Sequence, residues 1–129
     1  MSRQPHISDS EWEVMNVLWE SSPMAANEVA DAICERMDWH LTTLKTLLGR
    51  LVKKGALRYR QEGNRYLYRP AFPRERYVEA ESRSFVNRVF GGKTTPALVH
   101  FVAMMQLSDD DLKELRATLE KKEKGEPRS

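Results

Sequence analysis

The stretch that decides the fold is LTTLKTLLGRLVKKGALRYRQEGNRYLYRP, residues 41–70. Leucine recurs at positions 41, 44, 48 and 51, which lie on one face of a helix that we predict over residues 41–54. Gly55 follows as a glycine of the kind that ends helices. Two short strands, 56–60 and 65–69, are predicted next, joined by a turn. The sequence therefore predicts a helix followed at once by a β-hairpin.

Two further amphipathic helices are predicted before this stretch. The first begins near Ser10, after a cap at Ser8 or Asp9, and its apolar face comprises Trp12, Met15, Leu18 and Trp19. The second begins near Ala26 or Asn27, and its apolar stripe comprises Val29, Ile33 and Met37. Three helices followed by a hairpin are the arrangement of a winged helix-turn-helix.

Helical periodicity returns after the hairpin. We expect a helix over 75–90, a second over 96–105 with a cap at Thr94 or Thr95, and a third that follows a cap at Ser108. The predicted fold class is therefore mainly α with a small β-hairpin. We divide the chain into a winged helix-turn-helix domain, residues 1–72, and a helical dimerisation region, residues 73–129, with a short disordered tail.

The second region carries more apolar side chains than a small helical segment needs. Because a winged helix closes its own core, these side chains require another partner, and a second copy of the chain is the one we expect. The alternative is a monomer in which these helices fold back on the winged helix. The residues expected in the dimer contact are Phe85, Phe90, Leu98, Phe101, Val102, Leu112, Leu115 and Leu119.

Charge is distributed unevenly along the 129 residues, whose formal net charge is +2. The first third is acidic, the last part is neutral, and residues 39–76 carry ten Lys or Arg against two acids. A concentrated basic block indicates a polyanion partner, although an Arg-rich solvated surface would give the same balance.

The predicted third helix has the features of a DNA recognition helix. Opposite its leucines it presents hydroxyl and cationic side chains and no acid, as a helix entering the major groove requires. The residues expected to bind double-stranded DNA are Thr42, Thr43, Lys45, Thr46, Arg50 and Lys53 on the helix, with Arg58, Arg60, Arg65 and Arg69 in or beside the hairpin. We expect Tyr59, Tyr66 and Tyr68 to pack in the core rather than stack on nucleic acid. Gly49 marks either a close approach or a tolerated surface glycine.

Other classes of protein fit the sequence less well. His6, His40 and His100 fall in separate elements, and no nucleophile elbow, phosphate loop or zinc-type spacing is present, so we expect no enzyme, no metal and no cofactor. A single cysteine, Cys34, and an N-terminus without an apolar stretch favour a cytoplasmic protein with no membrane insertion. A winged helix used only for protein contacts would present a neutral face instead.

The order and spacing of many short segments resemble the penicillinase and methicillin-resistance repressor family, which also includes copper-responsive repressors. The resemblance covers about residues 7–122. The matching segments are Ile7–Met15, Leu18-Trp19, Asn27–Val29, Thr43–Leu48, Arg50–Leu57, Glu62-Gly63, Tyr66–Pro70, Tyr77-Val78, Glu81-Ser82, Ser84-Phe85, Asn87-Arg88 and Gly91-Gly92. The paired Cys-X-Cys motifs of the copper-responsive branch are absent from this sequence.

The resemblance implies a homodimeric repressor that binds a palindromic operator in front of antibiotic-resistance genes. It also implies release by proteolysis in the C-terminal region, triggered by a membrane sensor with a metalloprotease domain or by a downstream protease. The family's cleaved bond is commonly Asn-Phe, and His100-Phe101 stands at the matching position here. The alternatives are a repressor of another regulon that responds to an unseen ligand or metal, and a winged-helix interaction module.

Overall fold

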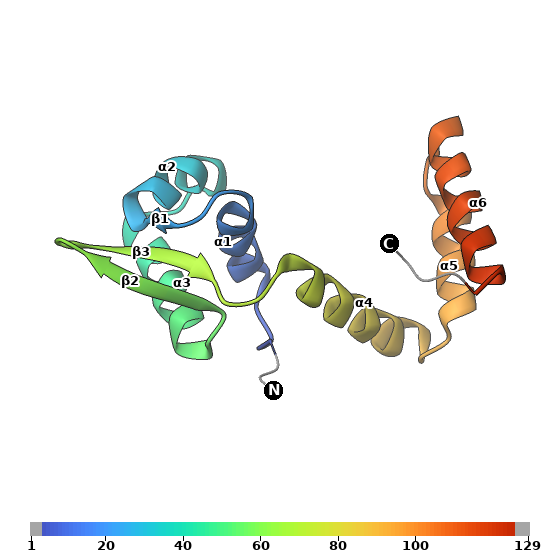
Figure 1. Cartoon of the computed structure of the whole chain (residues 1–129), viewed down its shortest axis with the longest axis horizontal. Coiled ribbons are helices and arrows are strands. Elements are labelled where there is room, and N and C mark those ends of the chain that lie inside the picture. Colours follow the sequence, from blue (N-terminus) through green and yellow to red (C-terminus); the bar gives the residue numbers. More distant parts are fainter. Residues whose placement is uncertain (1–3, 126–129) are drawn as a thin grey trace. The chain divides into compact units, whose positions relative to one another are not determined.

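The computed structural model describes residues 4–125 and contains two compact units, the first ending at Glu81 and the second beginning at Ser82 (Figure 1). The first unit contains α1 (Asp9–Glu20), β1 (Met24–Ala25), α2 (Ala26–Met37), α3 (Leu41–Lys54), β2 (Leu57–Glu62), β3 (Arg65–Pro70) and the start of α4 (Arg74–Phe90). Three helices followed by a hairpin confirm the predicted winged helix-turn-helix fold.

Local signals in the sequence fix the ends of the first three helices. The Ser8 hydroxyl caps α1 by accepting from the Glu11 N–H at 3.2 Å, and the Glu11 carboxylate accepts from the Ser8 N–H at 2.7 Å. Helix α3 ends at Lys54 and is followed by Gly55, whose φ of 85° suits a residue without a Cβ. The predicted limits of α3 are confirmed.

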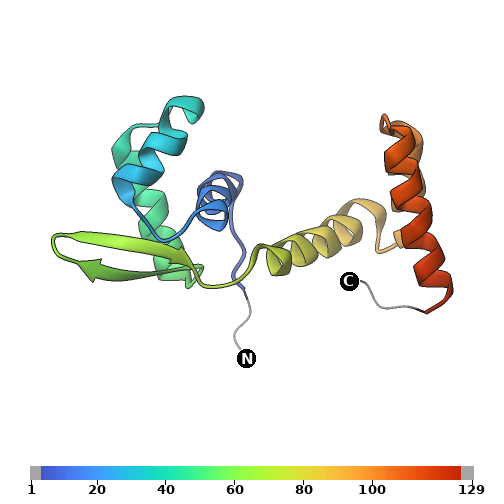
Figure 2. The same cartoon turned by 45° about the horizontal axis from the view of Figure 1, so that its top comes forward.

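The sheet has three antiparallel strands in the order β1-β3-β2. The hairpin pairs Arg58 with Arg69 and Tyr59 with Tyr68, and its turn extends beyond α3 in both views (Figures 1 and 2). The sequence analysis missed β1, because two residues, Met24 and Ala25, show no alternation of their own. They form a strand only because β3 supplies their hydrogen-bond partners.

The core of the first unit lies between α1, α2, α3 and the base of the hairpin. Leu44, Leu48 and Leu51 of α3 are buried as predicted. Leu41 is 45% exposed, which contradicts its place in the expected core face, and Leu47 is buried instead. Because Leu41 begins the helix, it lies beyond the edge of α1 and α2, whereas the middle of α3 is covered on a wider arc.

Two of the three hairpin tyrosines lie outside the core, contrary to expectation. Tyr59 and Tyr66 are 50% and 46% exposed, and their ring centroids are 4.7 Å apart. Tyr59 lies on the edge strand β2 directly opposite Tyr68, and Tyr66 lies beyond the residues of β3 that pair with β1, so each ring packs against other tyrosines of the hairpin. Tyr68 is half-buried near the base.

An aromatic cluster attaches the start of α4 to the first unit. Tyr77 is buried, and its ring lies 5.2 Å from that of Trp19 and 6.2 Å from that of Trp12. The Trp19 indole N–H donates to the Phe72 carbonyl at 3.0 Å. Burial raises the pKa of Tyr77 to about 12. The first unit therefore continues past residue 72, through the first turns of α4.

The second unit comprises the rest of α4, α5 (Thr94–Met104) and α6 (Asp109–Glu123). Ser108 caps α6 as predicted, accepting from the Asp111 N–H at 3.1 Å. The expected cap of α5 at Thr94 or Thr95 is wrong, because the helix begins at Thr94 itself and Lys93 occupies the cap position without a side-chain bond. The predicted tail begins at Gly125, and its last four residues lie outside the described part of the chain.

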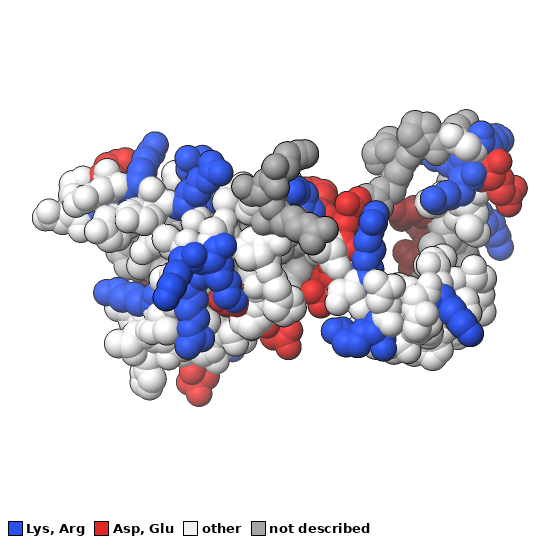
Figure 3. Space-filling model, turned by 90° about the horizontal axis from the view of Figure 1, so that it is seen from below, with Lys and Arg blue, Asp and Glu red and all other residues white. Residues whose placement is uncertain are grey.

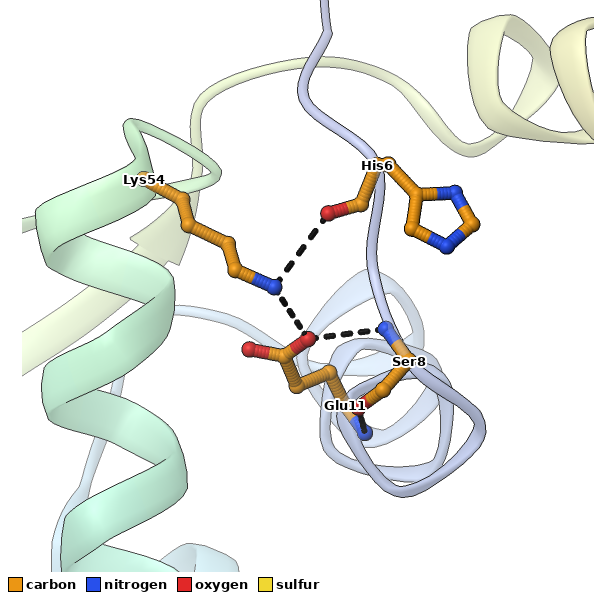
Figure 4. A network of polar contacts seen from close by, with 4 residues as sticks. All are labelled: His6, Ser8, Glu11 and Lys54. Atoms are coloured by element: carbon orange, nitrogen blue, oxygen red, sulfur yellow. Dashed lines mark hydrogen bonds and ion pairs between the residues drawn. The ribbon is translucent and has the colours of Figure 1, made fainter.

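Glu11 connects the start of α1 to the end of α3. Its carboxylate is 2% exposed and accepts from the Lys54 ammonium at 2.6 Å as well as from Ser8 (Figure 4). Burial alone would raise the pKa of Glu11, but the hydrogen bonds from Lys54 and Ser8 outweigh burial and lower this pKa below its ordinary value of 4.5.

A lowered folded-state pKa makes stability depend on acid. Protonation of Glu11 is harder in the folded chain than in the unfolded one, so its contribution is present above pH 4.5 and is lost as the pH falls through the folded-state pKa. We expect the unfolding free energy of Glu11→Gln to decrease less on acidification than that of the wild type. The difference should be about 1–3 kcal/mol, the value of a charge-assisted hydrogen bond. Chemical denaturation at a series of pH values from 6 to about 3 measures this difference.

Glu13→Gln is the matched control, because it removes a half-exposed carboxylate from the same helix. Its curve should follow that of the wild type. Parallel curves for Glu11→Gln and the wild type would contradict the assignment.

Candidate nucleic-acid interface

One face of α3 is exposed and free of acids. Thr42, Thr46 and Arg50 follow one another at four-residue spacing and are all exposed, as are Thr43, Lys45 and Lys53 beside them. The Thr46 hydroxyl donates to the Thr42 carbonyl at 3.0 Å, which directs its oxygen lone pairs outward. The fold therefore brings the six predicted helix residues to one exposed side, opposite the buried leucines. We call Thr42, Thr46 and Arg50 the exposed row.

The four hairpin arginines are also exposed, but they differ in their partners. Arg60 lies 3.4 Å from Glu62, and Arg65 lies 3.8 Å from Glu28 of α2. Such exposed pairs contribute little, so a phosphate could compete for either arginine. The pairing of Arg65 with Glu28 was not predicted, since the two residues are far apart in sequence.

Arg58 and Arg69 face each other directly across β2 and β3. Neither forms an ion pair with any residue between positions 4 and 125. Like charges at opposed positions of a sheet destabilise it, and a bound anion would relieve the repulsion. Both arginines, with Lys54 and Gly55, line a surface hollow at the base of the hairpin.

Many basic side chains of this unit lie on the same side of it. Figure 3 shows Lys and Arg gathered on one face of the first unit. A winged helix used only for protein contacts would present a neutral face here, and the observed face is basic. The electrostatic requirement for binding a polyanion is therefore met.

Gly49 lies in the exposed part of α3 without any steric need for glycine inside the chain. A Cβ built at this position meets no atom within 4 Å. The close approach of another backbone segment of the same chain is therefore excluded within the described residues. An external ligand or a tolerated surface glycine remains as the reason for this residue.

The second unit brings the predicted dimer residues together without burying them. Phe85, Phe90 and Phe101 form a half-buried cluster, with the Phe85 and Phe101 rings 5.8 Å apart. The remaining members are exposed or half-buried, and among described residues after Glu81 only Ala97 is buried. Val89, Val99, Met104 and Met105 belong to the same exposed apolar set and were missed, although their spacing from Leu98 and Val102 could have shown them.

The predicted cleavage bond lies inside α5. His100 is exposed and Phe101 is half-buried against Phe90, with ring centroids 6.1 Å apart.

Among residues 4–125 no helix is long and apolar enough to cross a membrane, and no three acidic, His or Cys side chains are placed to hold a metal ion.

Comparison with known proteins finds one family along nearly the whole chain. The family model described as penicillinase repressor matches residues 7–121. The penicillinase repressor of Bacillus licheniformis is 38% identical over 120 residues, which cover 93% of this chain and 94% of that protein. The methicillin resistance regulatory protein MecI of Mammaliicoccus sciuri is 34% identical over 116 residues, covering 90% of this chain and 94% of that protein.

A solved structure resembles the first unit. The solution structure of monomeric Bacillus licheniformis BlaI in complex with the blaP half-operator is 40% identical, with a TM-score of 0.53. The match covers 60% of this chain and 94% of that one.

Proposed function

The chain belongs to the penicillinase repressor family, and we propose that it represses β-lactam-resistance genes by binding operator DNA as a homodimer. Membership in a family of repressors confirms the predicted resemblance and the expectation that the chain is not an enzyme. The observation that carries the proposal is the exposed, acid-free side of α3 beside a hairpin with unpaired arginines. The BlaI structure bound to a half-operator supports the same use of the matching unit.

Within this proposal the exposed row enters the major groove and the hairpin follows the phosphate backbone. Threonine hydroxyls and the Arg50 guanidinium read or position the duplex, while Lys45, Lys53 and the hairpin arginines neutralise phosphates. Arg58 and Arg69 are the strongest candidates for phosphate contact, because an anion between them would relieve their mutual repulsion.

The exposed row can be tested by single substitutions. Arg50→Ala and Thr46→Ala should both weaken binding to a duplex selected by the wild-type protein from a random library. Loss of a base contact would cost about 1–3 kcal/mol at one position, and loss of a phosphate contact would lower the salt slope by about one. Fluorescence anisotropy across a salt series measures both effects.

Arg36→Ala serves as the control, because Arg36 is an exposed arginine of α2 that pairs with Glu13 of α1. It should leave the affinity unchanged. Wild-type affinity in both α3 variants would refute the interface.

The second unit supports assembly of two copies. Leu98 and Val102 are 58% and 50% exposed at four-residue spacing on α5, and Leu115 and Leu119 repeat this pattern on α6. In the BlaI structure, one monomer is in complex with a half-operator. A dimer of this chain would place one winged helix on each half of a full operator. We therefore propose that a second copy of the chain covers these side chains.

A charge placed in this apolar set should separate the copies. We expect Val102→Glu to sediment as a 15 kDa monomer at a concentration where the wild type is a dimer. Its affinity for a full operator should fall by about 10²-fold, because the two halves no longer bind together. Thr95→Glu adds the same charge to a polar position of α5 and should remain dimeric. A monomeric wild type at high micromolar concentration would contradict the proposal.

Release from DNA is proposed to follow cleavage of His100-Phe101. Because the bond lies within α5 and Phe101 packs against two other phenylalanines, α5 must open locally before a protease can bind it. A cut there detaches the end of α5 and all of α6 from the DNA-binding unit, so the two half-sites lose their linkage without any change in a DNA contact. The protease is the membrane sensor, or the downstream protease, that the family resemblance implies.

Intact-mass measurement tests the cleavage. Protein recovered from cells exposed to a β-lactam should include a fragment that ends at His100. Phe101→Gly should remain full-length under the same conditions, if the protease requires an apolar side chain after the bond. Derepression with only the full-length species would exclude proteolysis and favour an unseen ligand.

A further inference from the structure

Lys54 lies within the basic block, at the border between the two sides of α3. It follows Arg50 of the exposed row at four-residue spacing and Leu51 of the buried stripe at three-residue spacing. Its side chain is 37% exposed, and its ammonium is directed to two acceptors, Glu11 at 2.6 Å and the His6 carbonyl at 3.3 Å (Figure 4). The Lys54 ammonium at the C-terminal end of α3 is therefore held by two acceptors of the protein itself.

Glu11 has two roles that depend on the same oxygen. Its Oε1 atom accepts from the Ser8 N–H, which closes the capping box of α1, and also from Lys54. Its second oxygen, Oε2, is buried and has no hydrogen-bond partner among the described residues. An isolated cap needs neither burial nor a cation, so this arrangement serves the connection between α1 and α3 rather than the cap alone.

The connection adds something that apolar packing does not provide. Hydrophobic contacts are non-directional, so four buried leucines hold α3 on the core but resist its rotation and axial sliding only weakly. A short ion pair with defined acceptors is directional, and in some proteins such pairs select one arrangement of the packed elements. The Glu11–Lys54 pair therefore fixes the C-terminal end of α3 relative to α1.

We propose that Glu11 and Lys54 are positioning residues for DNA recognition, which set the orientation of the exposed row, and that Lys54 does not contact phosphate. The proposal rests on the DNA-binding function proposed above and adds a specificity determinant that acts through contacts inside the protein rather than through DNA. If Lys54 instead neutralised a phosphate, its loss would weaken binding to every duplex alike. If the pair only stabilised the fold, its loss would lower the melting temperature and leave the selectivity of the folded protein unchanged.

Binding to two duplexes distinguishes these roles. One duplex is selected by the wild-type chain from a random library, and the other is a scrambled sequence of the same composition. Full-length Glu11→Gln, Lys54→Met and the double variant are compared at a temperature where thermal melts show each one folded. We expect the ratio of the two affinities to fall about tenfold in each variant, with no further fall in the double variant. Lys54→Arg should restore the ratio, since a guanidinium can still donate to Glu11.

The salt slope on the scrambled duplex gives the second readout. It should be unchanged in Lys54→Met, whereas Lys53→Met, which removes the neighbouring exposed cation, should lower it by about one. A slope lowered by one in Lys54→Met, or an unchanged affinity ratio in Glu11→Gln and the double variant, would overturn the proposal. If Lys54→Met does not fold, Glu11→Gln and the double variant still decide the matter.

Failure of the underlying function has a different signature. A wild-type chain that selects no duplex, or whose weak binding is insensitive to Lys53→Met and Arg50→Ala together, would refute DNA binding and this inference with it. Normal wild-type binding with a response to Lys53→Met, but unchanged selectivity in the Glu11 and Lys54 variants, would refute only the inference.

Discussion

The structure of the first unit depends on α3 having two incompatible sides. Leu44, Leu47, Leu48 and Leu51 require removal from water, and the exposed row requires access to it. Only a helix laid across α1 and α2 satisfies both demands, because a deeper position would bury Arg50 and a shallower one would expose the leucines. The position of the hairpin follows, since β2 begins three residues after α3 ends and Leu57 is still in the core.

Periodic and local features of this fold could be predicted from the sequence, and features that depend on distant partners could not. The limits of α3 follow from its leucine spacing and Gly55, and the exposure of the six predicted contact residues on α3 follows from the same periodicity. Strand β1, by contrast, exists only because β3 pairs with it. The exposure of Tyr59 and Tyr66 depends on where β1 joins the sheet, since β1 pairs with neither β2 nor the residues of β3 before Leu67. The Glu11–Lys54 pair joins residues 43 positions apart. Such contacts leave no pattern within a short window of sequence.

The two units differ in how completely they bury their apolar side chains. The first buries its large aliphatic side chains almost completely, whereas the second leaves valines, leucines and methionines of α5 and α6 open to solvent. A unit that leaves a large set of apolar side chains open to solvent is expected to bury them against a partner. The roles proposed for DNA recognition and for assembly therefore fall in different parts of the chain, and α4 contributes Tyr77 to the first core and Phe85 to the second cluster.

The opposed arginines at the base of the hairpin also affect the free protein. Arg58 and Arg69 carry like charges at opposed positions of the sheet, so a small anion that reduced their repulsion would compete with DNA for this place. By linkage, operator affinity then depends on which anion is in solution as well as on its concentration. A strongly bound anion such as phosphate competes more effectively than acetate at equal ionic strength. Under the proposed function, the anions in the surrounding solution would therefore set part of the protein concentration at which the operator is occupied.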